Sequence, residues 1–310
     1  MFEAILLGVL TSMVVQGTPL LLTAMGEIVD QRAGTLNLGL EGLMLVGAIC
    51  GFITAQNTGN LALGFLAGGA AGAGLAVIHG FLSISFRVHQ AICGLALNMF
   101  ASGLSGFIGR NYLGQAMSVS MENHAIPLLS KIPYIGPVFF NTDFMVYFTY
   151  LLVPALMFFL FKTQAGLRLR ACGENPTAAY SRGIHVNRMR YLAVIFGGFM
   201  AGLGGAYLVF KAVPTWVEGL TGGRGWIALA VVTVSMWKPS TAMIYAFLYG
   251  CVESLAYQFQ GIGVGIPAVI LKMLPYAFTI LAMWVVSIRS KRHGIVGPAA
   301  CGSAFTPEEG

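Results

Sequence analysis

Charged residues are scarce in this chain. Only 9% of its 310 residues are Asp, Glu, Lys or Arg, whereas 57% are hydrophobic and the mean hydropathy is +0.79. Soluble domains are about 25% charged, so this composition excludes a soluble globular protein. The net charge of +6 comes without interleaved basic and aromatic residues, so nothing indicates nucleic acid as a partner.

Cysteine pairs and the short motifs of common enzymes are also lacking. The five cysteines are scattered without a CxxC pair, which predicts neither a disulfide framework nor a metal site. No GxxxxGK[ST], HExxH or GxSxG stretch occurs, so the sequence has no phosphate-binding loop and no familiar protease or esterase motif. An intramembrane enzyme is disfavoured as well, because no paired Asp, Ser–Lys or His–Glu arrangement is present.

Long apolar runs are what the chain does have. Several are about 20 residues long, enough for an α-helix to cross a hydrocarbon core of about 30 Å. The sequence therefore predicts an all-α polytopic membrane protein with about nine transmembrane segments, some of them broken or re-entrant. The first run lacks a basic leader and a cleavage site and is expected to be retained as a span. The expected segments are 4–25, 36–54, 61–83, 91–108, 143–161, 191–210, 226–237 (short for a full crossing), 240–259 and 266–288.

Basic residues are concentrated in one stretch, the basic segment (residues 162–190), which holds six of the 17 Lys and Arg residues. Cytoplasmic loops carry an excess of Lys and Arg, so we expect this segment to be cytoplasmic. The C-terminal tail (residues 289–310), with Arg289, Lys291, Arg292 and His293, is expected on the same side. Five segments before the basic segment then place the N-terminus outside, together with the long polar connection 110–142.

The middle of the basic segment contains helix start and stop signals. Asn175 can cap a helix, Pro176 suits its first position, and Gly183 can close it in a left-handed conformation. The predicted helix, 176–182, is too short to be stable alone in water and needs support from neighbours or a partner. An ordinary cytoplasmic loop with a chance turn is the other interpretation of this pattern.

Four polar residues lie within apolar runs and are candidates to line a translocation pathway: Asn37, Glu41, Asn98 and Glu253. An ionisable side chain at membrane depth is costly and usually faces a cavity or a partner. The two asparagines can bind an uncharged polar solute or bridge two helices. Both roles stay open for each residue.

Glycine spacing suggests close helix packing and a weak internal symmetry. Gly64, Gly68 and Gly72 recur every four residues, which lets helices approach closely in lipid. In each half of the chain, a polar Gly-containing stretch with an arginine, Arg32 or Arg224, precedes an apolar run. Broken helices at corresponding positions of two halves often line a transporter pathway.

Three segments of the chain stand out, in the order 26–44 (GEIVDQRAGTLNLGLEGLM), 166–179 (GLRLRACGENPTAA) and 222–230 (GGRGWIALA). Together they resemble the permease subunits of nucleoside and simple-sugar ABC importers, in the superfamily of ribose and branched-chain amino acid permeases. The resemblance runs nearly end to end. One departure is MWKP at 236–239, where a glycine is expected near Trp237.

The resemblance implies a type II ABC importer permease-like fold and a division of labour between subunits. Residues 1–288 would form the transmembrane permease domain, with the basic segment as its cytoplasmic coupling loop and 289–310 as a cytoplasmic tail. A separate ATPase would dock on this loop and hydrolyse ATP with Mg²⁺, so this chain would bind no cofactor and be no enzyme. The coupling residues would be Gly166, Arg168, Ala171, Gly173, Glu174, Asn175, Pro176, Ala178, Ala179 and Arg182.

The resemblance also implies partners, a location and a substrate class. A second permease subunit, in this family often a non-identical paralogue, would complete the pathway. An extracytoplasmic substrate-binding lipoprotein would deliver the solute to the bacterial plasma (inner) membrane. The expected solute is a nucleoside or a similar polar small molecule, with a simple sugar or a flavin as the alternatives. The competing hypothesis is an ion- or proton-coupled secondary transporter in which Glu41 and Glu253 carry protons.

Overall fold

The protein is almost entirely helical. The computed structural model describes residues 2–261, 267–293 and 297–306. The longer apolar runs form helices because every backbone N–H and C=O group must be satisfied internally in lipid. In chain order the elements are α1 (Phe2–Arg32), α2 (Leu40–Thr58), α3 (Leu61–Gly80), the π-helical turn η1 (Phe81–Ser85), α4 (Gln90–Gly109), η2 (Arg110–Tyr112), β1 (His124–Ala125), η3 (Leu129–Lys131), α5 (Ile135–Phe139), β2 (Asn141–Thr142), α6 (Phe144–Lys162), α7 (Gln164–Glu174), α8 (Pro176–Ser181), α9 (Val186–Tyr207), the π-helical turn η4 (Leu208–Ala212), α10 (Arg224–Val234), α11 (Pro239–Gly261) and α12 (Ala268–His293).

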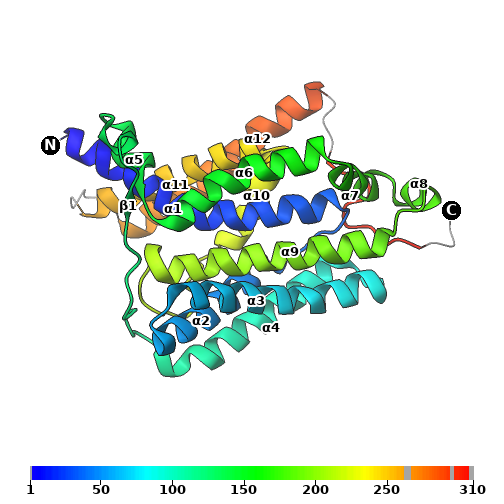
Figure 1. The fold of residues 1–310 in the computed structure, drawn as a ribbon, viewed down its shortest axis with the longest axis horizontal. Coiled ribbons are helices and arrows are strands. Elements are labelled where there is room, and N and C mark those ends of the chain that lie inside the picture. The colour runs from blue at the N-terminus through cyan, green and yellow to red at the C-terminus, as the bar shows by residue number, and fades with distance from the viewer. Residues whose placement is uncertain (1, 262–266, 294–296, 307–310) are drawn as a thin grey trace.

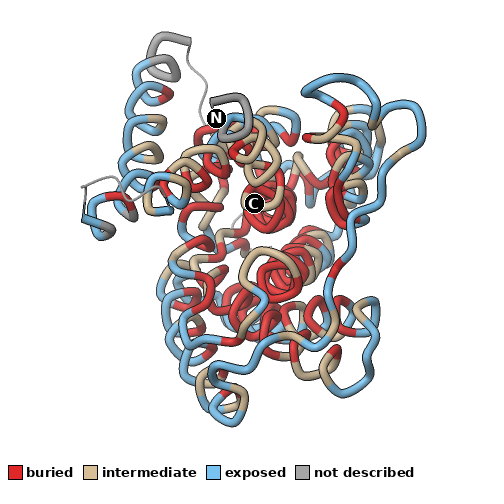
Figure 2. The backbone as a smooth tube through the Cα atoms, turned by 90° about the vertical axis from the view of Figure 1, so that its left-hand side faces the viewer, coloured by how far each residue is buried: buried red, intermediate tan, exposed pale blue. Residues whose placement is uncertain are grey.

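The long helices lie side by side, with their axes along the length of the molecule (Figure 1). Helix α1 packs against α9 and α11, α9 packs against α2 and α3, and α4 and α12 lie at the outside. Buried residues are concentrated in the middle of the bundle when it is viewed along its length (Figure 2). The two ends differ. The N-terminus, β1 and α5 lie at one end, whereas α7, α8 and the C-terminus lie at the other, called the α7–α8 end below.

Glycines bring three of the central helices into close contact. A Cβ added to Gly47 on α2 would lie 2.5 Å from the Cα of Gly202 on α9. One added to Gly68 on α3 would lie 2.7 Å from the carbonyl oxygen of Gly47. The predicted spacing of small residues on α3 therefore packs helices within this chain.

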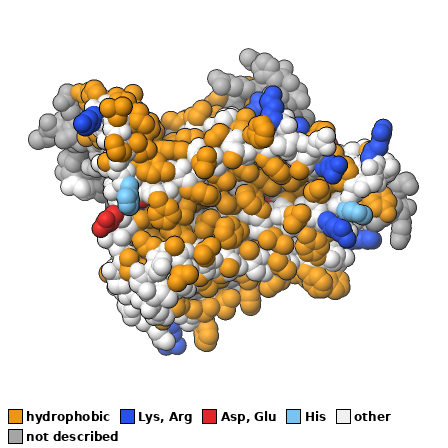
Figure 3. Space-filling model, in the orientation of Figure 1, with side chains coloured by type: hydrophobic (Ala, Val, Ile, Leu, Met, Phe, Trp, Pro, Cys, Tyr) orange, Lys and Arg blue, Asp and Glu red, His pale blue; other side chains and the backbone are white. Residues whose placement is uncertain are grey.

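The flanks of the bundle are apolar, as a membrane protein requires. Hydrophobic side chains cover the face between the two ends, and several Lys and Arg side chains gather at the α7–α8 end (Figure 3). Among the described residues, seven helices are long and apolar enough to span a membrane. The predicted count of nine is not confirmed, because α10 has only 11 residues and α11, with 23 residues, carries polar side chains including Glu253.

Several segment boundaries differ from those expected. The expected break after residue 25 is wrong, because α1 continues through Glu27 and Asp30 to Arg32. Gln31 donates a hydrogen bond to Glu27 one turn earlier at 2.7 Å, so buried polar side chains here satisfy one another within the helix. The segment expected at 36–54 begins later, at Leu40. Residue 266, the expected start of the last segment, lies outside the described residues.

The basic segment and the described part of the C-terminal tail lie at the same end of the bundle, as expected. Ala300 of the tail donates its backbone N–H to the carbonyl of Gly173 at 2.8 Å. The polar connection 110–142 lies at the opposite end with the N-terminus. It includes a small antiparallel pairing in which His124 is opposite Thr142.

Candidate functional site

The basic segment forms two short helices, α7 and α8, with the predicted local signals in place. The Asn175 side chain accepts a hydrogen bond from the backbone N–H of Ala178 at 2.9 Å, and Pro176 occupies the first position of α8. Gly183 closes the turn with a φ of 79°. These contacts confirm the predicted cap, start and stop. Helix α7, capped by the Thr163 hydroxyl, was not predicted.

The predicted coupling residues divide into an exposed and a buried set. A partner protein can reach only the first set directly, so these residues cannot all act in the same way. The exposed residues are Arg168, Glu174, Asn175, Ala178 and Arg182, the half-buried ones are Ala171 and Pro176, and the buried ones are Gly166, Gly173 and Ala179.

The two buried glycines hold α7 against its neighbours. A Cβ at Gly173 would collide with the carbonyl of Arg32 at the end of α1, and one at Gly166 would collide with the carbonyl of Phe159 on α6. Because these are backbone atoms, neither neighbour can move aside cheaply. Gly166 and Gly173 therefore position the basic segment on the membrane helices.

The C-terminal tail packs directly against this segment, a contact that the sequence did not predict. Buried Arg190 donates a hydrogen bond to the carbonyl of Ser303 at 2.9 Å. The ring of Phe305 packs in a small apolar cluster with Cys172 and Ala179, and its centroid lies 5.8 Å from that of Tyr180. The described part of the tail thus packs against the buried face of α8.

Burial also affects the thiols beneath the tail. It raises the pKa of the Cys172 thiol above its usual value. It raises the pKa of the Cys301 thiol to about 12, and the neighbouring Glu27 and Asp30 carboxyl groups add to this increase. Both thiols are therefore protonated at neutral pH and react slowly with electrophiles.

A second cluster of polar residues lies deep in the bundle, where the segments around Glu41 and Arg224 meet. The Glu41 carboxylate accepts hydrogen bonds from the backbone N–H of Gly223 at 2.7 Å and of Gly225 at 2.6 Å. The Thr221 hydroxyl donates to the same carboxylate at 2.5 Å. Glu41 thus satisfies N–H groups at the start of α10, where a negative charge also favours the helix dipole.

Arg224 and Glu253 form a buried ion pair on the other side of this turn. Their side chains are 2.5 Å apart at Nη2 and Oε1, and the two residues are 6% and 8% exposed. Helix α10 runs from Arg224 to a turn whose Trp237 carbonyl accepts a hydrogen bond from Arg32. Eleven residues of helix span about 16 Å, so the pair lies at membrane depth rather than at the α7–α8 end.

A cavity of about 200 Å³ adjoins this ion pair. Tyr249, Tyr257 and Tyr276 line it together with Gln260 and Glu253. The Tyr257 hydroxyl lies 3.4 Å from a carboxylate oxygen of Glu253. The tyrosines were not predicted, although a helix repeat of four residues places Tyr257 on the same face as Glu253.

The two predicted asparagines lie apart from this polar cluster. The Asn37 side chain accepts a hydrogen bond from the backbone N–H of Gly39 at 2.8 Å, which shapes the turn before α2. The backbone of Asn98 on α4 packs against Gly42 of α2. The structure thus brings Glu41 and Glu253 to two sides of the 221–225 turn, and leaves Asn37 and Asn98 between helices.

The departure at residues 236–239 also has a structural counterpart. Met236 and Trp237 adopt φ values of 53° and 55°, a left-handed conformation that favours glycine. The Trp237 indole N–H donates to the side chain of Gln31 at 2.6 Å. Side-chain contacts of Trp237 therefore hold a turn that a glycine would form without strain.

Several curated proteins of similar sequence are named as transporter permeases. TsgC13 of Haloferax volcanii, named for glucose ABC transport, is 36% identical over 97% of this chain and 98% of its own. The guanosine ABC transporter permease protein NupQ of Bacillus subtilis is 38% identical over 87% and 88%. The nucleoside ABC transporter permease protein NupC of Lactococcus lactis is 34% identical over 89% and 90%. A second permease of the same two transporters, NupP and NupB, also matches this chain.

The fold is shared with a solved structure of an ABC transporter of metal-chelate type in an inward-facing conformation. The two chains superpose with a TM-score of 0.51 at 16% identity, over 90% of this chain and 85% of the other. Residues 9–286 match the model of the family described as the branched-chain amino acid transport system permease component. With that match and relatives above 30% identity along most of its length, this chain belongs to the permease component family of branched-chain amino acid transport systems.

Proposed function

We propose that this chain is the permease subunit of an ABC importer and forms half of the pathway for a nucleoside or a similar polar small molecule. The observation that carries this proposal is the arrangement of α8. This capped helix stands at the end of the bundle, presents Ala178 and Tyr180 to solvent, and rests on α7 and the tail. A short helix held in this way suits a contact through which another protein moves the bundle.

In this proposal the energy comes from outside the chain. A cytoplasmic ATPase docks on the basic segment and hydrolyses ATP with Mg²⁺, while this subunit binds no cofactor. The excess of Lys and Arg at the α7–α8 end supports a cytoplasmic position for the basic segment and the tail in the plasma (inner) membrane. A second permease, as in the paired relatives, and an extracytoplasmic binding protein complete the importer.

The cavity beside Arg224 and Glu253 supports a nucleoside as the solute. Heterocyclic bases stack on aromatic side chains, and three tyrosines line this cavity together with Gln260. A simple sugar is one alternative solute, since two similar permeases are named for glucose. A flavin is the other alternative. Radiolabelled guanosine, glucose and riboflavin, compared in one uptake assay of the assembled transporter, separate these solutes.

The contacts of the two glutamates argue against a proton-coupled secondary transporter. Glu41 is held by two backbone N–H groups and a hydroxyl, and Glu253 is paired with Arg224. Each carboxylate thus contacts other groups of this chain and has a structural role that needs no proton transfer.

Site-directed crosslinking tests the ATPase contact. In a chain without native cysteines, Ala178→Cys should crosslink to the ATPase of the assembled transporter, because residue 178 is exposed on α8. Glu122→Cys, exposed at the opposite end, is the matched control and should not crosslink to it. If residue 178 never contacts a nucleotide-hydrolysing subunit in a transporting assembly, the proposal is wrong.

A further inference from the structure

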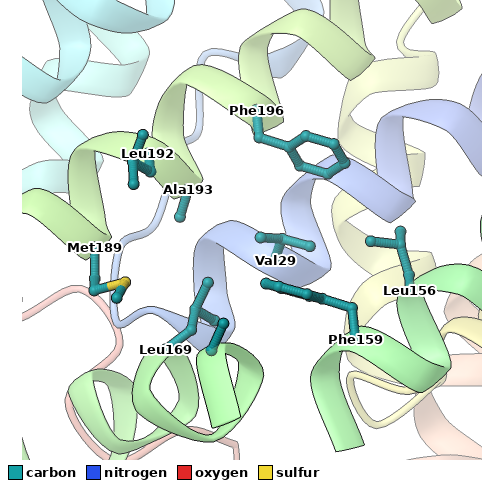
Figure 4. A pocket seen from close by; sticks show the side chains of 9 residues that line it. Val29, Leu156, Phe159, Leu169, Met189, Leu192, Ala193 and Phe196 are labelled. Carbon is teal, nitrogen blue, oxygen red and sulfur yellow. The ribbon is translucent and has the colours of Figure 1, made fainter. Parts of the chain in front are cut away.

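An apolar cavity of about 450 Å³ lies beside the basic segment, and none of the transport steps above uses it. Figure 4 shows side chains from four helices pointing into it, among them Val29 of α1, Phe159 of α6, Leu169 of α7 and Phe196 of α9. Its lining contains almost no polar surface. Leu192, at its rim on α9, is 64% exposed, so the cavity opens on the flank of the bundle.

A second hollow, of about 330 Å³, continues the first toward the α7–α8 end. Met189 and Leu192 line both, so the two join between α7 and α9. The continuation is lined by three exposed arginines, Arg168, Arg182 and Arg188. The two hollows thus form one slot, apolar along the flank of the bundle, with a basic mouth near the start of the membrane-spanning helix α9.

The arginines at this mouth have no acidic partner in the described part of the chain. The single salt bridge found among the described residues joins Arg224 to Glu253, far from this mouth. Guanidinium groups bind phosphate through paired N–H groups, and basic pockets beside transmembrane helices at the cytoplasmic side attract anionic head groups. An acyl chain matches the apolar slot, and a phosphate head group matches its mouth.

We propose that this slot binds one anionic phospholipid of the surrounding bilayer, with an acyl chain between α6, α7 and α9 and its phosphate at Arg168, Arg182 and Arg188. The assignment of the lipid to the cytoplasmic leaflet rests on the proposed function. A lipid seated there contacts both α7 and the first turns of α9. It therefore links the position of the basic segment to the composition of the membrane.

Lipid retention by the purified full-length chain tests this site. The chain is purified in an uncharged detergent, and native mass spectrometry counts bound palmitoyl-oleoyl phosphatidylglycerol against phosphatidylcholine with the same chains. Wild-type protein should retain one phosphatidylglycerol in preference to phosphatidylcholine. Arg188→Gln should lower that preference about fivefold, the effect of one basic residue at a membrane surface. Arg110→Gln, which changes an exposed residue of η2 at the opposite end of the bundle, is its matched control and should leave the preference unchanged.

Two further arms separate a lipid from a free anion. Leu192→Trp should fill the apolar slot and abolish retention, whereas Leu151→Trp, 71% exposed on α6, should not. The melting temperatures of both variants are measured to establish that they are folded. Millimolar inorganic phosphate should leave the lipid bound, because phosphate alone gains nothing from the apolar slot.

Equal retention by the Arg188 and Arg110 variants, or displacement of the lipid by phosphate, would overturn the proposal. The assay contains neither ATPase nor solute. A negative result therefore leaves the importer proposal standing, and a failed crosslink to the ATPase leaves the lipid site standing.

Discussion

Glu41 and Gly223 join two parts of the chain that are 182 residues apart, through a 2.7 Å hydrogen bond from the Gly223 backbone N–H to the Glu41 carboxylate. The same carboxylate accepts from Gly225 with its other oxygen. Helix α10 starts at this point, in the interior of the bundle. Glu41 thus caps α10 from a different helix, α2.

Glu41→Gln keeps the size of the side chain, and we expect it to destabilise the protein. The amide keeps one acceptor oxygen but turns an NH₂ group toward a backbone N–H, so one buried donor loses its partner. An unsatisfied buried donor costs about 1–3 kcal/mol. The melting temperature in detergent should fall by several degrees, while Glu122→Gln, which changes an exposed side chain, should leave it unchanged. Equal melting temperatures would show that Glu41 does not hold this turn.

The cap of α8 could be predicted from sequence because its signals are local. Asn175, Pro176 and Gly183 act on backbone atoms within a few residues, so the amino acids themselves indicate the helix. The contact between Ala179 and Phe305 could not be predicted, because tertiary packing brings these distant positions together. The sequence shows that Glu41 and Glu253 are ionisable groups within apolar runs, where burial is costly. It does not show which residues they contact.

The number of spans shows the same limit. Apolar runs locate helices well, yet α1 continues past its apolar part because Glu27 and Gln31 satisfy one another. Helix α11 is long enough to span a membrane but carries the polar residues of the cluster around Glu253. Hydropathy alone cannot distinguish a helix that spans the membrane with polar side chains facing a cavity from a polar helix that does not span it.

The ion pair of Arg224 and Glu253 should show strong coupling in a double-mutant cycle. Glu253→Gln or Arg224→Met alone leaves one buried group without its partner, at a cost of about 3–5 kcal/mol. The double variant should be less destabilised than the sum of the two, since neither charge remains. Unfolding in detergent measures all four proteins. Glu253→Gln combined with distant Arg110→Gln should be additive, and additivity of the ion-pair variants as well would contradict the assignment.

Ala178 and Ala179 are neighbours on α8 with opposite environments, which makes them a matched pair. Ala179 is 3% exposed beside Phe305, whereas Ala178 faces solvent. Ala179→Glu should lower the melting temperature because it buries a charge in an apolar cluster. Ala178→Glu should not, since Glu at the third helical position after an N-cap is favourable.

Uptake by the assembled transporter then separates packing from coupling. Ala178→Glu should reduce solute uptake and ATPase association although the subunit is fully folded. Unchanged uptake in this variant, with normal stability, would mean that the exposed face of α8 is not the docking surface.

The thiol of Cys301 reports whether the tail is packed against α8. Its pKa is about 12 when the tail is docked, so only on the order of one thiol in 10⁴ is ionised at pH 8. Phe305→Ala removes the ring that anchors the tail on Cys172 and Ala179. Undocking should return the pKa of Cys301 toward about 8.5, and labelling with a maleimide at pH 8 should become about 10³-fold faster.

The pH dependence of the labelling rate shows the direction in which docking of the tail shifts the pKa of Cys301. With the tail docked, the labelling rate should rise steadily between pH 7 and pH 10, because the thiolate fraction grows until the pH approaches the raised pKa. In Phe305→Ala the rate should level off above pH 9, because the thiol is then mostly ionised. The other four cysteines are replaced by alanine, and Ala304→Ser, an exposed change next to Phe305, serves as control. If all three proteins level off at the same pH, the tail does not shield Cys301 and Phe305 does not anchor it.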